Sequence, residues 1–289
     1  MDKNSKVIGH ILCLICVLVW GSATVSSRIA LNVLSPEELL LLRFLIGYIF
    51  LWVISPNFVK LDSVKEELIC LVCGLFGVTL YFYFQNVALL YTVASNVSII
   101  NSLSPMFTVI LGFIIARSKP SKYFVIGFII SIIGINLVIF SGKIVFDGSL
   151  KGNSLAFLAS IVWGSYSVFI KQLEKYPMVI ITRKVFFYGL ITMIPILLHT
   201  GIEFPLKKIL IPEVYLNLVY MGCVASAIGF IIWNRGVKIL GPVKTSLYSY
   251  AIPIATVIFS VVFLQEVLTV QRIIGGVIVI IGLMISQKV

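Results

Sequence analysis

The polar residues that could bind a small molecule lie inside long apolar runs of the chain. The segment "LVWGSAT" at 18–24 has a close copy, "IVWGSYS", at 161–167, so Trp20 and Trp163 occupy matching places in two such runs. A buried indole N–H needs a hydrogen-bond acceptor, and the glycine that follows lets a helix or a ligand come close. The motif therefore supports two interpretations, a wall of a polar pocket or a tight helix contact, of which we favour the pocket.

A second group of polar residues recurs at the spacing of one helix face. Ser95, Ser98 and Ser102 precede Pro105 at steps of three or four residues, and Asn101 lies beside them. Serine and asparagine in hydrocarbon must find partners between helices, so hydrogen bonds between helices explain this stripe as well as substrate contacts do. Asn101, whose amide both donates and accepts, is the first candidate for a substrate contact. The further candidates are Tyr83, Asn86, Ser98, Tyr166, Trp233, Asn234, Tyr248 and Tyr250.

These residue types favour binding over bond making. Aromatic rings can wall a cavity for an amphipathic metabolite or hold a cation over their faces. Arg43 and Arg183 lie a few residues inside apolar runs, close enough to an end for their charges to reach water. Every Asp and Glu falls in a loop or near the end of a run, so no proton-carrying carboxylate is evident. A neutral polar site bordered by basic residues favours a zwitterion or a weak anion, whereas the aromatic rings favour a cation.

Other classes of function lack the residues that they need. An enzyme within the membrane would need a nucleophile with a base, paired carboxylates or a metal cluster, and neither a Gly-x-Ser-x-Gly motif nor a phosphate-binding Gly-x-x-x-x-Gly-Lys motif occurs. The five cysteines lie in apolar runs, with only His10 nearby, which favours small apolar fillers over a metal site. We therefore expect no enzyme, no metal and no cofactor. The net charge is +11, but its basic residues are scattered between apolar runs, so we do not expect nucleic-acid binding.

The elements that must position the polar residues are membrane-spanning helices. Of 289 residues, 60% are hydrophobic and 11% are charged, whereas a soluble domain carries roughly 25% charged residues. A spanning helix needs about 20 mostly apolar residues. Ten runs meet this description, at 8–31, 38–55, 68–91, 94–116, 122–141, 152–173, 178–199, 213–234, 242–264 and 269–286. The first run is too long for a signal peptide and resembles the internal run at 152–173, so we expect it to be the first helix.

The lysines and arginines predict the orientation of these helices. Most of them fall in the loops on the same side as the N-terminus, and basic loops stay in the cytoplasm. We therefore expect a multi-pass protein of the cell membrane, plasma or inner, with both termini in the cytoplasm.

Collinear matches divide the chain into two repeats, 1–143 and 144–289. Trp20-Gly21-Ser22 matches Trp163-Gly164-Ser165, and from the third run on residue n matches residue n + 148. The second set of matches is Asn86 with Asn234, Ser98 with Ser246, Pro105 with Pro253, Gly127 with Gly275 and Gly134 with Gly282. Matches of Trp, Asn, Pro and Gly in one order are improbable by chance in an apolar sequence.

Each repeat has five runs, and this odd number makes the second repeat enter the bilayer from the opposite side. Inverted repeats are typical of secondary transporters, whose substrate site lies near the bilayer midplane between the halves. Pro105 and Pro253 are expected to kink their helices and to free backbone carbonyls, which makes them candidate hinges.

Three stretches carry a resemblance to a known family. They are the paired "VWGS" segments, "FQNVALLYTVASNVSIINSLSPMFTVILGFI" and "IWNRGVKILGPVKTSLYSYAIPIATVIFSVVFLQEVLTVQRIIGGVIVIIG". With them, the whole of 8–286 resembles an EamA-type member of the drug/metabolite transporter superfamily. The first repeat departs from the pattern, with Arg117-Ser118 where the second has Gln265-Glu266. The resemblance implies ten transmembrane helices in two inverted five-helix repeats around a central cavity, which the first, third, fourth, sixth, eighth and ninth helices line.

The residues and the resemblance together predict a secondary transporter, a permease that works by alternating access. The resemblance makes export of an amino acid or a similar zwitterion the first expectation. Import of a quaternary-amine or nucleoside-like metabolite is the alternative, and an intramembrane enzyme is a remote one. The expected partners are a small-molecule substrate and the lipid bilayer, and the sequence indicates neither a partner protein nor an oligomeric state.

Overall fold

The computed structural model describes residues 3–57, 59–116, 121–139, 149–173, 175–201, 204–240 and 248–286. Within these residues every regular element is a helix, and consecutive helices join into ten rods, as predicted. The rods of the first repeat are α1 (Lys3–Ala30); α2 (Pro36–Ile54); α3 (Val64–Gly74) with η1 (Leu75–Leu80) and α4 (Tyr81–Tyr91); α5 (Ala94–Asn101) with α6 (Ser104–Ala116); and α7 (Lys122–Ile139). Those of the second are α8 (Ser149–Ile170) with η2 (Lys171–Leu173); α9 (Met178–Thr192) with α10 (Ile194–Thr200); α12 (Pro212–Val219) with η3 (Tyr220–Ile228) and α13 (Gly229–Leu240); α15 (Ile252–Leu264); and α16 (Val270–Ser286). A short helix, α11 (Leu206–Ile209), precedes α12.

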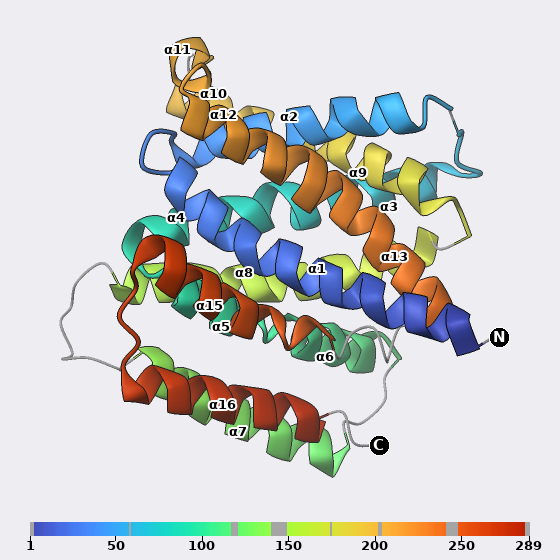
Figure 1. Cartoon of the computed structure of the whole chain (residues 1–289). Coiled ribbons are helices and arrows are strands. Elements are labelled where there is room, and N and C mark those ends of the chain that lie inside the picture. The colour runs from blue at the N-terminus through green and yellow to red at the C-terminus, as the bar shows by residue number, and fades with distance from the viewer. Residues whose placement is uncertain are drawn as a thin grey trace.

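The surface of the bundle suits a lipid environment. Among the described residues, six helices are long and apolar enough to cross a membrane. Large apolar side chains point outward along the rods; Leu18, Leu198 and Phe263 keep 55%, 78% and 63% of their surface exposed. In a bilayer these side chains contact acyl chains that are as apolar as they are. The start of α1 and the end of α16 lie at the same end of the bundle (Figure 1), as an even number of crossings requires.

The contact between α7 and α16 shows that the two repeats are inverted (Figure 1). A Cβ atom on Gly134 would lie 2.7 Å from the Gly275 carbonyl oxygen, and Gly127 meets Gly282 in the same way. Low residue numbers of one helix thus face high numbers of the other, so the helices are antiparallel. Because Gly127 matches Gly275 and Gly134 matches Gly282, exchanging the repeats turns each contact into the other. A two-fold axis across the rods therefore relates the halves.

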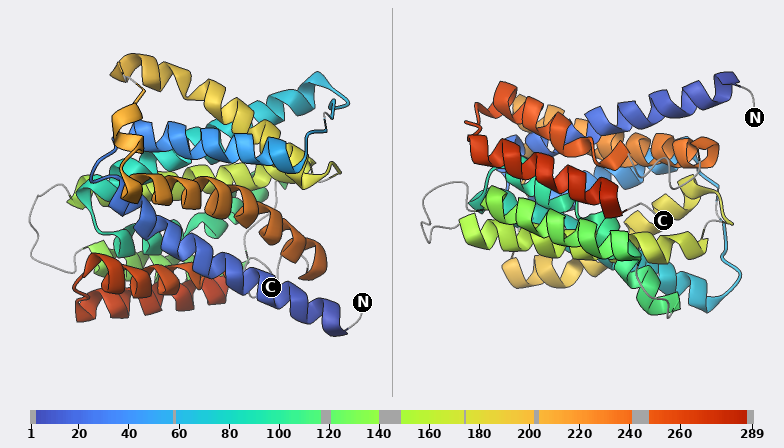
Figure 2. Two further views of the ribbon diagram at one scale, coloured as in Figure 1. Left: turned by 45° about the horizontal axis from the view of Figure 1, so that its top comes forward. Right: turned by 90° about the horizontal axis from the view of Figure 1, so that it is seen from below.

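The rods of one repeat pack on those of the other throughout the bundle. Gly74 in α3 lies against α9, where an added Cβ would be 2.6 Å from the Gly189 nitrogen. The matching residue in the second repeat, Gly222 in η3, lies against α2, 2.9 Å from the Arg43 carbonyl oxygen by the same measure. These close approaches fix the depth and rotation of the middle rods. Figure 2 shows the crossed packing from two further sides.

Carboxylates hold the rods together at the end of the bundle where α1 ends. Glu38 closes a capping box with Ser35 at the start of α2, and its carboxylate pairs with the ammonium of Lys208 at 2.8 Å. Glu266, in the connection from α15 to α16, accepts hydrogen bonds from the backbone nitrogens of Ala94 (2.7 Å) and Ser95 (3.3 Å) and from the Ser95 hydroxyl. A carboxylate there satisfies amides at the start of α5 that have no helical partner.

The opposite end of the bundle carries an exposed cluster of charges. Lys175, between η2 and α9, lies 2.8 Å from a carboxylate oxygen of Asp62 and 2.6 Å from one of Glu66. The hydrogen bond from Lys175 lowers the pKa of Asp62 below its ordinary 3.8, and the same pairing raises the pKa of Lys175. The cluster joins the connection that precedes α3 to the one that precedes α9, and so links the two repeats.

Candidate substrate site

A polar cluster lies between the rods near the middle of their length, and Arg43 is its charged member. Arg43 lies near the middle of α2 with only 4% of its surface exposed. Its Nε atom donates a hydrogen bond of 2.8 Å to the Ser226 hydroxyl in η3, and its guanidinium lies 4.3 Å from the centre of the Phe82 ring. The expectation that Arg43 reaches water at a helix end is therefore wrong, because contacts with Phe82 and Ser226 hold the guanidinium among the rods.

Tyr81, Gln85 and Asn101 form a second part of the cluster. The Asn101 amide nitrogen donates to the Gln85 side-chain oxygen at 3.0 Å and lies 3.5 Å from the Tyr81 hydroxyl. The Asn101 side-chain oxygen is buried without a hydrogen-bond partner. Burying an amide oxygen without a donor costs about 1–3 kcal/mol. Such an atom in a polar cluster marks a place where a ligand donor would be stabilised.

Tyr220 connects the cluster to the first Trp-Gly-Ser motif. Its hydroxyl is 2.6 Å from the Ser22 hydroxyl and 3.0 Å from the Val19 carbonyl oxygen of α1. Tyr220 shares η3 with Ser226, the Arg43 partner, and the Tyr81 ring lies 4.7 Å from that of Phe82, over which the Arg43 guanidinium lies. Rods from both repeats thus surround one guanidinium. We call Ser22, Arg43, Tyr81, Gln85, Asn101, Tyr220 and Ser226 the central polar cluster.

The two motif tryptophans lie beside this cluster and share a neighbour. The ring centre of Phe230 is 5.9 Å from that of Trp20 and 6.0 Å from that of Trp163. Trp163 also lies 4.6 Å from Tyr81, and Trp20 lies 5.0 Å from Trp233. The structure thus brings Trp20, Trp163 and Trp233 together at the centre of the bundle, where they form an aromatic border to the polar groups.

The glycines of the motif have a separate role in packing. A Cβ on Gly21 would lie 2.6 Å from the Ala255 Cβ of α15, and a Cβ on Gly164 would lie 2.6 Å from the Phe107 Cβ of α6. Ala255 and Phe107 match under the n + 148 alignment, so the two contacts are equivalent. The motif glycines therefore make the tight helix contact, whereas the role of the tryptophans as a wall of a substrate pocket stays a prediction.

The middle rods have π-helical turns at matching places. When the repeats are aligned by n + 148, η1 corresponds to residues 223–228 of η3. The Trp20 indole nitrogen donates to the Ala225 carbonyl oxygen within η3 at 3.0 Å, and the Arg43 partner Ser226 is the next residue. Wide π turns are rare and are frequent at functional sites. Here they supply contacts to both Trp20 and Arg43.

Pro105 and Pro253 follow breaks in their helices. The rod of α5 and α6 is interrupted at residues 102–103, and α15 begins after a matching turn at 250–251. Pro105 has no N–H to donate to the Asn101 carbonyl oxygen, which instead accepts a bond of 2.6 Å from the Ser104 hydroxyl. The break thus directly follows Asn101. A hinge role for the two prolines stays a prediction.

Several predicted site residues bind other parts of the protein. The Ser98 hydroxyl donates to Thr256 of α15 at 2.9 Å, which is a hydrogen bond between helices. The Asn86 amide nitrogen donates to the Pro36 carbonyl oxygen at the start of α2, while its buried side-chain oxygen has no partner. Tyr83, which lies between Tyr81 and Gln85 in the sequence, is near Glu37 of α2 instead.

The tyrosines of the second repeat are spread over the bundle. Tyr166 is buried and packs against Gly77 of η1, with its ring 5.0 Å from that of Trp163. The Tyr248 hydroxyl lies 2.5 Å from a ring nitrogen of His10, far along α1 from Trp20. Tyr250 belongs to the apolar core. The side chain of Asn234 lies outside the described residues.

Sequence reasoning missed Tyr220, Ser226 and Phe230 as members or neighbours of the cluster. From the rod that holds Tyr81 and Gln85 it chose Tyr83 and Asn86 instead. The i, i + 4 spacing of Tyr81 and Gln85 sets them on one helix face and could have identified them. Arg43 carried the signal of a charge inside an apolar run, which is a functional indication by default.

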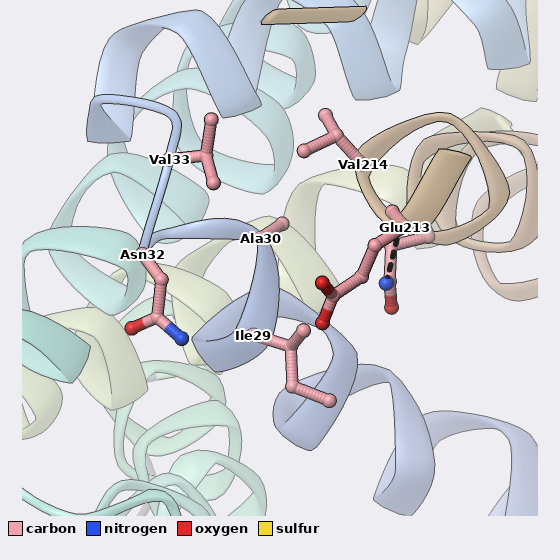
Figure 3. Close-up of a pocket in the computed structure, with 7 residues that line it drawn as sticks. Ile29, Ala30, Asn32, Val33, Glu213 and Val214 are labelled. Atoms are coloured by element: carbon pink, nitrogen blue, oxygen red, sulfur yellow. Dashed lines mark hydrogen bonds between the residues drawn. The ribbon is translucent and has the colours of Figure 1, made fainter. Parts of the chain in front are cut away.

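One small pocket lies away from the cluster, at the end of α1 (Figure 3). It has a volume of about 50 Å³ and is lined by Asn32, Val33, Glu213, Val214 and their neighbours. Sites for small molecules usually measure about 300–1,000 Å³, so this pocket is too small for a metabolite. Among the described residues, no group of three or more His, Cys, Asp and Glu residues could hold a metal ion.

Two inverted repeats that meet in a polar and aromatic centre define a multi-pass membrane transporter. The sequence profile of the EamA-like transporter family matches residues 7–140 and 150–287. The chain therefore belongs to the EamA-like transporter family, a family of transporters rather than of enzymes, as its sequence predicted.

Individual relatives agree with this assignment. The chain is 30% identical over 288 residues to an "uncharacterized transporter" of Archaeoglobus fulgidus, covering 98% of both chains. It is 30% identical to the "uncharacterized transporter YyaM" of Bacillus subtilis over 75% of this chain and 71% of that one. It is 22% identical to a "probable terminal-alkyne amino-acid exporter" of Streptantibioticus cattleyicolor, covering 99% and 95%. A crystal structure that is 20% identical and covers 99% of both chains has the same fold, with a TM-score of 0.66.

Proposed function

We propose that this EamA-family transporter exports an amino acid or a similar zwitterion by alternating access. The observation that carries the proposal is the place of the central polar cluster, between two repeats that exchange under a two-fold axis. Exchanging the conformations of two such halves would open the cluster first to one side of the membrane and then to the other. The 22% identical relative described as an amino-acid exporter supports this class of substrate.

We further propose that the chain lies in the cell membrane with both termini in the cytoplasm, and that residues 1–143 and 144–289 act as the two moving halves. The basic loops support this orientation. Alternating access needs hinges, and the helix breaks before Pro105 and Pro253 are at matching places in the halves. Rocking about them would tilt α6 and α15 relative to the central polar cluster.

The aromatic border favours a second candidate, import of a quaternary amine or a nucleoside-like compound. Trp20, Trp163 and Phe230 offer ring faces that could hold a cation or a base. The guanidinium of Arg43 opposes a cationic substrate, since like charges repel at this depth. An amino acid therefore fits the charges better.

Counterflow in proteoliposomes tests the proposed function. Vesicles with the purified protein are loaded with one unlabelled amino acid, and uptake of the labelled form from outside is followed. A carrier gives saturable uptake that depends on the internal load, whereas a channel gives uptake that does not saturate. Absence of counterflow with all amino acids, with counterflow of choline or a nucleoside instead, would refute the amino-acid proposal and establish the substrate class of the second candidate.

Variants of the site residues tie the flux to the proposed place. We expect Trp20→Ala, Trp163→Ala and Asn101→Ala to abolish counterflow while the protein still reaches the membrane. Phe263→Ala on the exposed face of α15 and Asn136→Ala on the exposed face of α7 are the matched controls, and both should transport normally. Normal flux in all three site variants would remove the proposed site.

A further inference from the structure

Arg43 has a positive charge that no acidic side chain balances in the part of the chain that the structure describes. Among the described residues the ion pairs join Lys175 to Asp62 and Glu66, Lys184 to Glu67, and Lys208 to Glu38, and none includes Arg43. The groups that contact its guanidinium are the Ser226 hydroxyl and the rings of Phe44 and Phe82, all of them uncharged. A charge near the bilayer centre is costly and usually marks a functional site. Buried charges are ordinarily paired, so the missing partner requires an explanation.

The guanidinium also has donors to spare. An arginine has five N–H donors in a planar fork that fits a carboxylate in a bidentate manner. The structure gives Arg43 one hydrogen bond within the described residues, from Nε to Ser226. The two terminal nitrogens of the fork therefore remain for a ligand.

Arg183 is the matching arginine in the second helix of the second repeat, 140 residues after Arg43, and it shows that this state is particular to Arg43. Arg183 donates from both terminal nitrogens to the backbone carbonyls of Ser55 and Asn57, and its guanidinium lies 3.9 Å from the centre of the Trp52 ring. Its donors hold the end of α2. The two arginines therefore have different roles: Arg183 stabilises the end of α2, whereas the terminal nitrogens of Arg43 are left for a ligand.

A buried acceptor lies in the same cluster as the open donors. The Asn101 side-chain oxygen has no partner, and its amide nitrogen lies 3.5 Å from the Tyr81 hydroxyl. The Tyr81 ring lies 4.7 Å from that of Phe82, over which the Arg43 guanidinium lies. The terminal nitrogens of Arg43 and the side-chain oxygen of Asn101 thus belong to one cluster beside the aromatic border. A molecule with a carboxylate and a nearby ammonium would satisfy both.

We propose that Arg43 binds the carboxylate of the transported substrate and that the Asn101 side-chain oxygen accepts a hydrogen bond from its ammonium group. This inference rests on the proposed function and adds the substrate class: an α-amino acid whose carboxylate is obligatory. The side chain of the substrate would lie among Trp20, Trp163 and Phe230, which favours apolar side chains. The substrate carboxylate would then supply the negative charge that no described residue provides to Arg43.

Ligand series on the unmodified protein test the inference without any variant. Binding raises the melting temperature of the folded state, so all amino acids are first screened at millimolar concentration in detergent. For the amino acid with the largest shift, three probes follow: its methyl ester, the amine without its carboxylate, and the acid without its amino group. We expect no shift with the ester and the amine, and a reduced shift with the desamino acid. A shift of equal size with the ester or the amine, or no shift with any amino acid, would overturn the inference.

Arg43→Gln tests the residue itself, with Arg28→Gln as the control for lost charge. Glutamine keeps a donor for Ser226 but loses the charge, and Arg28 lies near the end of α1 and donates to Asn32. Losing a charge-assisted pair should weaken the affinity for the amino acid roughly 10- to 100-fold, whereas Arg28→Gln should bind normally. Arg43→Gln with unchanged affinity would overturn the inference.

The two proposals fail in different ways. Amino-acid counterflow that is unchanged by Arg43→Gln would refute the carboxylate role and leave the transport function standing. Binding of amino acids that depends on Arg43, without any counterflow, would support the carboxylate role and refute amino-acid transport. If Arg43→Gln does not fold, the ester and amine series on the unmodified protein still decides the inference.

Discussion

Replacing Gly164 by alanine should force α8 away from α6. A Cβ atom there would lie 2.6 Å from the Phe107 Cβ, 2.9 Å from the Ser104 carbonyl oxygen and 2.9 Å from the Thr108 nitrogen. Ordinary contacts of a Cβ begin at 3.4 Å, and two of these atoms belong to backbone that cannot rotate away. The rods must therefore separate by about 0.5–0.8 Å, since packed interiors have no spare volume. Trp163, the preceding residue, would move relative to the central polar cluster.

The size of the effect follows from two opposing terms. Overpacking of this kind costs about 1–3 kcal/mol, while alanine in place of glycine favours a helix by up to about 1 kcal/mol. Gly112 in α6 provides the control, because a Cβ there would meet nothing within 4 Å. Gly112→Ala should stabilise the protein slightly, and the difference in unfolding free energy between the two variants should be about 1–3 kcal/mol.

Unfolding in mixed micelles with increasing SDS, followed by tryptophan fluorescence, measures this difference. Gly21→Ala should behave like Gly164→Ala, because its Cβ would lie 2.6 Å from the Ala255 Cβ and 3.0 Å from the Thr256 nitrogen. Counterflow in the same variants reports whether the displaced tryptophans matter for transport. Gly164→Ala that is as stable as Gly112→Ala would refute the view that the motif glycine is a helix contact.

Four further predictions concern the ends of the rods. Arg183→Gln should destabilise the protein by about 1–3 kcal/mol in the same SDS assay, because it strands two carbonyls at the end of α2; equal stability would mean that these bonds are not formed. Glu266→Gln should cost about 0.5–2 kcal/mol by weakening the cap of α5, and a protein with unfolding identical to wild type would contradict that role. The pKa of Asp62 is lowered in the folded protein. Its contribution to stability is therefore fully present when the pH is above the pKa of the unfolded chain, and it is lost as the pH falls through the pKa of the folded protein. Carboxyl NMR should find the pKa of Asp62 higher in Lys175→Ala than in the unmodified protein. Protease protection in oriented vesicles should place both termini in the cytoplasm, and a single protected terminus would refute the even number of crossings.

The sequence predicted the rods well because hydropathy is a local property. A run of about 20 apolar residues spans the bilayer wherever it occurs, so the ten rods could be counted without knowing their contacts. The repeat could be predicted equally well, since the Trp-Gly-Ser motifs and the n + 148 matches are found in the amino-acid sequence itself. Inversion then follows from five crossings per repeat, and the contact of Gly134 with Gly275 agrees with it.

The site was predicted only in part, because polar residues inside a membrane have two possible uses. Ser98 and Asn101 lie on neighbouring faces of one rod, yet Ser98 bonds Thr256 and Asn101 keeps a buried oxygen without a partner. Nothing in the spacing separates these outcomes. Each depends on the rotation of the rod, which the packing of its neighbours sets.

The number, order and opposite directions of the rods were thus determined by the sequence alone, through hydropathy and internal repetition. The tertiary structure decided which polar groups meet. Arg43 donates a hydrogen bond to Ser226, which is 183 residues away in the sequence and lies in a π-helical turn that no local sequence pattern predicted. The physical reason is that apolar length acts on each helix separately, whereas a hydrogen bond between helices requires both to have the right depth and rotation. Those are fixed by close glycine contacts between the two repeats.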